Sequence, residues 1–192
     1  TDAFTSHPFR GNPAVVCLVT TEFPASRMQD IAREFNVSET AFVCGGAGLY
    51  AIRWFTPTRE LPLVGHATLA AAYVIMTSIE PALQEVTFFS ELSGKLLAYR
   101  EKDEFAIVLP ADETRICATP DALVQGLGST PIEVRIGRHY VARYDTVDEV
   151  RAVEPNFDLL ATLSRPTIAV TAPGEDCDYV LRFFAPANGV PE

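Results

Sequence analysis

The sequence predicts an α/β protein made of two similar domains, and three observations carry this prediction. Strand-like and helix-like segments alternate along the chain, the helix-like segment 66–76 is almost entirely apolar, and the order Arg, aromatic, aromatic, small residue, Pro occurs at 53–57 and again at 182–186. A helix without a polar face has to be enclosed by other elements, and a repeated motif indicates an internal duplication. We therefore expect a first domain at 1–110 and a second at 111–192.

The first half opens with a strand and an amphipathic helix. Residues 13–19 form a short run rich in β-branched side chains between turn-forming residues, which is typical of a buried strand. The following apolar residues have the spacing i, i+3, i+4 and i+7 of a helix with one buried face, namely Met28, Ile31, Ala32 and Phe35. Ser26 is a suitable N-cap for this helix, and Asn36 is a suitable stop.

The other elements of the first half are expected to surround the apolar helix. Segments 38–43 and 49–55 are typical of a hairpin, because the glycine-rich stretch between them can adopt a tight turn. Within 66–76 only Thr68 is neither apolar nor aromatic, so we expect this helix to be buried on all sides. Three further strands are expected at 85–90, 95–99 and 105–109.

The second half repeats this pattern. Thr119 and Pro120 indicate the start of a short helix, with Thr119 as its cap and Pro120 at its first helical position. Amphipathic helical stretches follow at 147–153 and 157–163, and strands are expected at 132–136, 140–144, 167–171 and 178–184. The sequence reaches Gly189–Glu192 without a counterpart of the apolar helix, so we expect the second domain to be truncated before its central helix.

Composition excludes several classes of partner. The 192 residues carry a net charge of −10 without any cluster of Lys or Arg, which argues against nucleic acid and anionic membranes as partners. No apolar run approaches the roughly 18 residues of a membrane span, and the first residues do not resemble a signal peptide, so we expect a cytoplasmic protein. The four cysteines form no CxxC pair, so we expect reduced, buried thiols rather than a zinc or redox site.

Five motifs along the chain resemble those of the phenazine-biosynthesis isomerase (PhzF-like) family. They are Asp2–Ser6 with Pro8–Ala14, Ser38–Phe42, Arg53–Pro57, Gly65–Thr68 and Arg182–Pro186. The resemblance implies the fold of diaminopimelate epimerase, with two pseudo-symmetric domains, each a mostly antiparallel sheet wrapped around a central helix, and an active site in the cleft between them. It also implies a homodimer, and isomerisation without a metal or an organic cofactor.

The residues and the resemblance point to the same candidate site. Gly65 and His66 stand at the start of the apolar helix, where free backbone N–H groups and the helix dipole favour a carboxylate. The resemblance implies that Glu39 is a general acid/base in a poorly solvated pocket and that His66 hydrogen-bonds the substrate. It implies a small carboxylate-bearing metabolite as the substrate, moved through a proton transfer, and it implies four substrate-binding residues, Gly65, Ala67, Ser38 and Asn12.

Each assignment has an alternative. A strand Glu is ordinarily solvated, a lone His often satisfies a backbone group, and small polar residues shape turns, which applies to Glu39, His66, Ser38 and Asn12. The alternative function is a catalytically inactive fragment or interaction module that retains the fold.

Two other enzyme classes are disfavoured by the sequence. A hydrolase built on Ser38 or a cysteine with His66 lacks a recognisable nucleophile elbow. A two-thiol racemase is disfavoured because Val64 precedes Gly65 where many relatives carry Cys. Arg53 and Arg182 each stand beside aromatic residues in the repeated motif, so we expect a structural pair rather than anion-binding residues.

Overall fold

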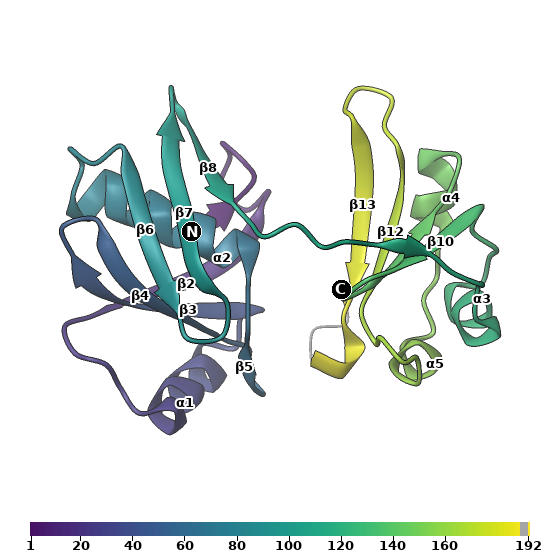
Figure 1. The fold of residues 1–192 in the computed structure, drawn as a ribbon, viewed down its shortest axis with the longest axis horizontal. Coiled ribbons are helices and arrows are strands. Elements are labelled where there is room, and N and C mark those ends of the chain that lie inside the picture. Colours follow the sequence, from purple (N-terminus) through teal and green to yellow (C-terminus); the bar gives the residue numbers. More distant parts are fainter. Residues whose placement is uncertain (189–191) are drawn as a thin grey trace. The chain divides into compact units, whose positions relative to one another are not determined.

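The structure, a computed structural model, describes residues 1–188 and 192 (Figure 1). It confirms the predicted α/β class, with two mixed sheets and their covering helices. The chain divides into two compact units, unit 1 at Thr1–Pro110 and unit 2 at Ala111–Glu192. Gly189, Val190 and Pro191, which precede the expected position of a second central helix, lie outside the described residues.

The sheet of unit 1 is mostly antiparallel. Its order is β1-β2-β3-β4-β6-β7-β8, with β5 paired to β4, and only the pairs β2–β3 and β4–β6 are parallel. Ala47 and Gly48, at φ 52° and 76°, form the tight turn of the predicted β3–β4 hairpin. The strands are β1 (Asp2–Ala3), β2 (Asn12–Val19), β3 (Glu39–Gly46), β4 (Leu49–Phe55), β5 (Glu60–Leu61), β6 (Glu85–Ser90), β7 (Gly94–Glu101) and β8 (Glu104–Val108).

Helix α2 (Gly65–Val74) and the π-helical turn that continues it, η1 (Ile75–Ile79), are at the centre of unit 1, and the strands curve around α2 in Figure 1. The side of α2 that faces the sheet consists of fully buried small residues, Ala67, Ala70, Ala71 and Ala72. The expectation of burial on all sides is wrong for Tyr73, which is 45% exposed. The sheet does not close on itself, and the Tyr73 ring packs in a T-shaped arrangement against Phe105 of the edge strand β8, with centroids 5.2 Å apart.

Helix α1 (Ala25–Phe35) covers the opposite face of the same sheet. Its buried residues Met28 and Ala32 pack against Phe42 and Phe55. Asn36 ends the helix in the left-handed conformation, as predicted. The prediction that Ser26 is the N-cap is wrong, because the helix begins one residue earlier, at Ala25, behind Pro24, and no side chain caps it.

The sheet of unit 2 has three helices on one face, α3 (Asp121–Leu127), α4 (Val147–Ala152) and α5 (Phe157–Ala161) (Figure 1). A Cβ at Gly126 would lie 2.6 Å from a Leu160 methyl carbon, so glycine allows α3 to pack closely on α5. Pro120 is the N-cap of α3 rather than its first residue, and Thr119 makes no cap, which corrects the prediction for this helix. The strand order is β13-β12-β11-β10-β9, with β9 (Arg115–Ile116), β10 (Glu133–Ile136), β11 (Tyr140–Arg143), β12 (Ile168–Pro173) and β13 (Tyr179–Phe184), followed by the 3-10 helix η2 (Pro186–Asn188).

The strand pairing agrees with the internal duplication. The series β1-β2-β3-β4 and β10-β11-β12-β13 share one pattern, antiparallel, parallel, antiparallel. The repeated motif lies at the ends of β4 and β13 and makes Arg182 the counterpart of Arg53. On the α2 side of β4, Tyr50, Ile52 and Trp54 are at most 3% exposed. Their counterparts in β13 are much more exposed: Tyr179 is 64%, Leu181 53% and Phe183 37% exposed.

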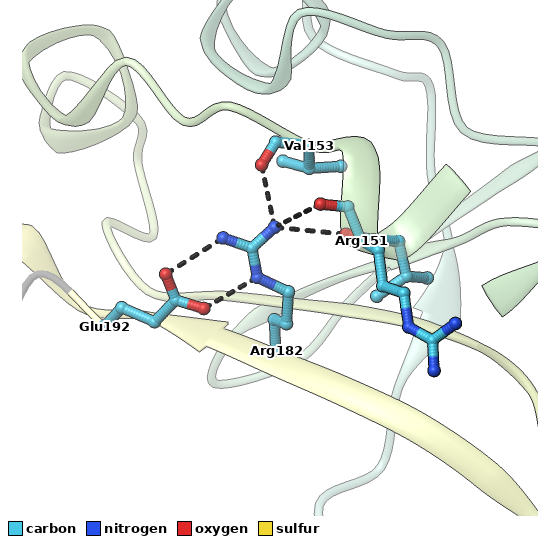
Figure 2. A network of polar contacts seen from close by, with 5 residues as sticks. Arg151, Val153, Arg182 and Glu192 are labelled. Atoms are coloured by element: carbon cyan, nitrogen blue, oxygen red, sulfur yellow. Dashed lines mark hydrogen bonds and ion pairs between the residues drawn. The ribbon is translucent and has the colours of Figure 1, made fainter. Parts of the chain in front are cut away.

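The two repeated arginines are structural, in agreement with their expected role. Arg53 binds both carboxylate oxygens of Glu60, at 2.7 and 2.8 Å, and its guanidinium lies 5.3 Å from the centre of the Phe55 ring. Arg182 likewise binds both oxygens of Glu192, at 2.6 and 2.9 Å (Figure 2). It also donates to the carbonyl groups of Val150, Arg151 and Val153 at the end of α4, so it ties the end of β13 to this helix.

The cysteines are free thiols, but the expectation that all are buried is wrong. Cys177 is exposed, and the other three are only partly buried. Burial raises the pKa of the Cys17 thiol, which keeps it protonated near neutral pH. In the part of the chain that the structure describes, no helix is both long enough and apolar enough to cross a membrane.

Candidate active site

Glu39 and His66 meet on the α2 side of the first sheet. Glu39 is the first residue of β3, and side-chain alternation places it on the same face as Ala41 and Val43, which belong to the core around α2. His66 is the second residue of α2. His66 Nε2 lies 3.2 Å from Glu39 Oε2, and the two side chains are only 10% and 11% exposed. The structure therefore brings together the two residues predicted to be catalytic.

The contact between these two side chains is not a hydrogen bond. The distance fits an ion pair, but within residues 1–188 and 192 no acceptor lies where a hydrogen on His66 Nε2 would point. A buried polar atom without a hydrogen bond costs about 1–3 kcal/mol, so this imidazole nitrogen can gain free energy from a ligand or a water that supplies a partner. His66 thus has an unused hydrogen-bonding position next to a buried carboxylate.

The first turn of α2 adds free backbone donors. The first intrahelical bond is donated by the Thr68 N–H to the Val64 carbonyl at 3.1 Å, and no side chain caps the helix. The N–H groups of Gly65, His66 and Ala67 precede that bond and are therefore left to a ligand or water. Partial positive charge at this helix end attracts an anion.

Packing does not explain the glycine at the start of α2. A Cβ at Gly65 would meet its nearest neighbour, Leu109 Cδ1, at 3.4 Å, which is ordinary contact. Gly65 is half-buried, and Ala67 is fully buried in the core. An absent side chain at position 65 leaves the backbone open to close approach by a ligand.

Ser38 and Asn12 are less directly connected to the pair. The Ser38 hydroxyl donates to the Pro13 carbonyl at 3.3 Å, which links the starts of β3 and β2. Asn12 is exposed and pairs with Ala3 in the sheet. Neither residue hydrogen-bonds Glu39 or His66 among the described residues, so their substrate-binding role remains a prediction.

Two more buried polar atoms lie near the site on neighbouring strands without a hydrogen-bond partner. They are Thr40 Oγ1 and Trp54 Nε1. Trp54 is opposite Ala41 in the β3–β4 pairing and so shares the face of Glu39, whereas Thr40 faces the other side. The sequence singles out Trp54 only as part of a motif, because the lack of an acceptor for its N–H depends on the packed core.

The described residues contain no group of three or more His, Cys, Asp or Glu side chains arranged to hold a metal ion. The candidate site has one carboxylate, one imidazole and the backbone N–H groups of a helix. This set can exchange a proton and bind an anion.

Comparison with known proteins agrees with this fold. The family model for phenazine biosynthesis-like protein matches residues 1–192. An uncharacterized isomerase of Pseudomonas aeruginosa is 43% identical over 191 residues, covering 100% of this chain and 73% of that relative.

Solved structures give the same result. The crystal structure of a PhzF-family phenazine biosynthesis protein of Enterococcus faecalis has a TM-score of 0.87 at 33% identity and covers 100% of this chain and 74% of that one. A predicted epimerase of Pseudomonas aeruginosa, at 20% identity and covering 88% of this chain and 67% of its own, has a TM-score of 0.65 and confirms the epimerase-like fold. The chain therefore belongs to the phenazine biosynthesis-like (PhzC-PhzF) family.

Proposed function

We propose that the protein is a cofactor-independent isomerase or epimerase that moves a proton on a small carboxylate-bearing metabolite. The family of the chain and a relative named as an isomerase support this reaction class. The proton transfer and the substrate class are supported by the chemistry of the Glu39–His66 site. Such a site can recognise a carboxylate group that lies next to the carbon from which the proton is removed.

Glu39 is the acid/base group of the proposal. As a carboxylate it accepts a proton from the substrate carbon, and as a carboxylic acid it returns the proton to another position. Its side chain is 11% exposed, so little bulk water competes for the proton while the substrate is bound.

The substrate carboxylate binds at the first turn of α2. The free N–H groups of residues 65–67 donate to its oxygens, and the helix dipole stabilises its charge. Gly65 permits the close approach that these short hydrogen bonds need.

His66 fixes the substrate relative to Glu39. Its Nε2 is buried, unpaired and 3.2 Å from the Glu39 carboxylate, so one ligand oxygen can bind Nε2 while the neighbouring carbon faces Glu39. This adjacency is the observation that carries the proposal. It also favours an active enzyme over the inactive interaction module, because a module would gain nothing from an unpaired buried imidazole beside a buried carboxylate.

The test is incorporation of solvent deuterium into a panel of small unsaturated and 2-substituted carboxylates, measured by mass spectrometry. Glu39→Gln keeps the shape of the side chain but cannot accept the proton, so we expect exchange to fall by about 100-fold or more. Glu85→Gln is the matched control, since Glu85 is an exposed residue of the same unit and undergoes the same charge change. Equal exchange in wild type and Glu39→Gln would remove Glu39 from the mechanism, and wild type that exchanges no member of the panel would contradict the proposed reaction class.

A further inference from the structure

The internal duplication assigns a counterpart in unit 2 to each residue of the candidate site. With Arg182 equivalent to Arg53, Phe184 is equivalent to Phe55. Phe55 pairs with Thr40, and Phe184 pairs with Ile168. Ile168 is therefore equivalent to Thr40. Glu39 precedes Thr40 and Thr167 precedes Ile168, so Thr167 occupies the position of Glu39.

The neighbouring strand extends the correspondence. Ala14 pairs with Glu39 in unit 1, and the pairing of Tyr140 with Ile168 makes His139 the counterpart of Ala14. A small apolar residue has thus been replaced by an imidazole next to the position of the proposed acid/base group. Two residues earlier in each unit, Gly137 corresponds to Asn12, a predicted substrate-binding residue.

His139 and Thr167 form a polar pair at this position. His139 Nδ1 lies 2.7 Å from Thr167 Oγ1, and the imidazole packs edge-on against Phe183 with centroids 5.1 Å apart. Phe183 is the counterpart of Trp54, so the pair lies on the face that corresponds to the α2 side of unit 1. Two contacts fix the ring, and Nε2 makes no hydrogen bond with the described residues.

The His139 imidazole is in a protonation state that lets one ring nitrogen donate a hydrogen bond. Burial lowers the pKa of His139, opposed by the charge of Asp112 and assisted by that of Arg138, so the ring is neutral at pH 7. When the Thr167 hydroxyl donates to Nδ1, the single ring proton is on Nε2.

Positive charge gathers around the same turn, although the chain as a whole has a net charge of −10. Arg138 precedes His139, and 58% of its side chain is exposed. It is loosely paired with Asp112, at 3.9 Å, and Asp112 also accepts the Arg138 backbone N–H at 2.8 Å. Arg165 donates to the Gly137 carbonyl at 3.3 Å.

We infer that His139, Thr167 and Arg138 form a second ligand site, within unit 2, in which His139 Nε2 donates to a carboxylate group and the charge of Arg138 attracts it. The duplication has kept a polar site at the equivalent position of both units but changed its chemistry. Unit 1 has an acid/base carboxylate there, and unit 2 has a neutral donor beside a cation, which binds an anion without exchanging a proton at carbon.

The test is a titration with sodium acetate at pH 7.5 and constant ionic strength, followed by 15N-edited NMR of the imidazoles. The chain has 3 histidines, and each reports on one question. His139 reports on the inferred site, His66 on the proposed active site, and the exposed His7, whose Nδ1 contacts Ser6, is the internal control. We expect a saturable shift of His139 Nε2 and only a small linear drift of His7.

Variants separate this site from the proposed active site. Thr167→Val removes the hydrogen bond that fixes the ring, and Arg138→Gln removes the cation, so each is expected to weaken acetate binding at His139 about tenfold while the His66 response stays unchanged. Arg115→Gln, at an exposed position of the same unit, is the charge-matched control. A His139 response no larger than that of His7, or one unchanged in both variants, would overturn the inference, whereas a missing His66 response would count only against the proposed function.

Discussion

His66 Nε2 lies 3.2 Å from Glu39 Oε2, yet it forms no hydrogen bond there. The two residues come from the start of a strand and the start of a helix that are 27 positions apart in the sequence. Their contact depends on the sheet curving around α2, so the fold of unit 1 creates the site. A buried pair with unused hydrogen-bonding capacity is suited to a ligand that supplies the missing partner.

The two arginine–glutamate pairs should differ in their contribution to stability. Arg53→Lys loses the bidentate hydrogen bonding to the Glu60 carboxylate, which should lower the free energy of unfolding by about 1 kcal/mol. Arg182→Lys should cost more, about 2 kcal/mol, because Arg182 also donates to the carbonyls of Val150 and Val153 at the end of α4. Urea unfolding of both variants checks the order, and a larger loss for Arg53→Lys would show that the carbonyl bonds contribute little.

Helix capping gives a second prediction. The Thr146 hydroxyl accepts the Glu149 N–H at 3.3 Å, and Glu149 accepts the Thr146 N–H at 2.9 Å, which forms a capping box at the start of α4. Thr146→Ala should cost about 1 kcal/mol of stability. Ser26→Ala should change stability by less than about 0.5 kcal/mol, because Ser26 caps nothing in α1. Thermal unfolding of the two variants distinguishes the helices, and equal losses would contradict this account of α1.

His139 should make the stability of the protein depend on pH. Its pKa is lower in the folded protein than the ordinary value of 6.5, chiefly because burial disfavours the charged ring. The unfolded chain therefore binds a proton more readily, so the stabilising contribution is fully present above pH 6.5 and is lost as the pH falls through the folded pKa.

The comparison with His139→Gln isolates this effect. Between pH 7.5 and pH 5, the melting temperature of wild type should fall more than that of the variant, since glutamine does not titrate. Parallel curves for the two proteins would show that burial of His139 has no energetic consequence in this range.

Local signals in the sequence were sufficient for much of the fold. The glycine-rich turn predicts the β3–β4 hairpin, and Asn36 predicts the end of α1, because both depend on a few neighbouring residues. The strands β5 and β9 have two residues each, which is too short for any periodic pattern, so neither is predicted from the sequence.

Features that depend on packing were not predictable in the same way. Tyr73 belongs to an apolar helix, so composition alone suggested burial, but it packs beside the edge strand β8 and is 45% exposed. Ser26 has the chemistry of a cap, but the helix starts one residue before it. Glu39 and His66 were predicted through family motifs, whereas their distance and the unpaired Nε2 follow only from the folded unit.

The central claim is that Glu39 and His66 act as one unit in proton transfer. The direct test is the rate of solvent-deuterium exchange into one active substrate for Glu39→Gln, His66→Gln and the double variant. Residues that act as a unit are not additive, so we expect the double variant to lose no more activity than Glu39→Gln alone. A double variant whose loss equals the product of the two single losses would show that the residues act independently, and this result would contradict the account.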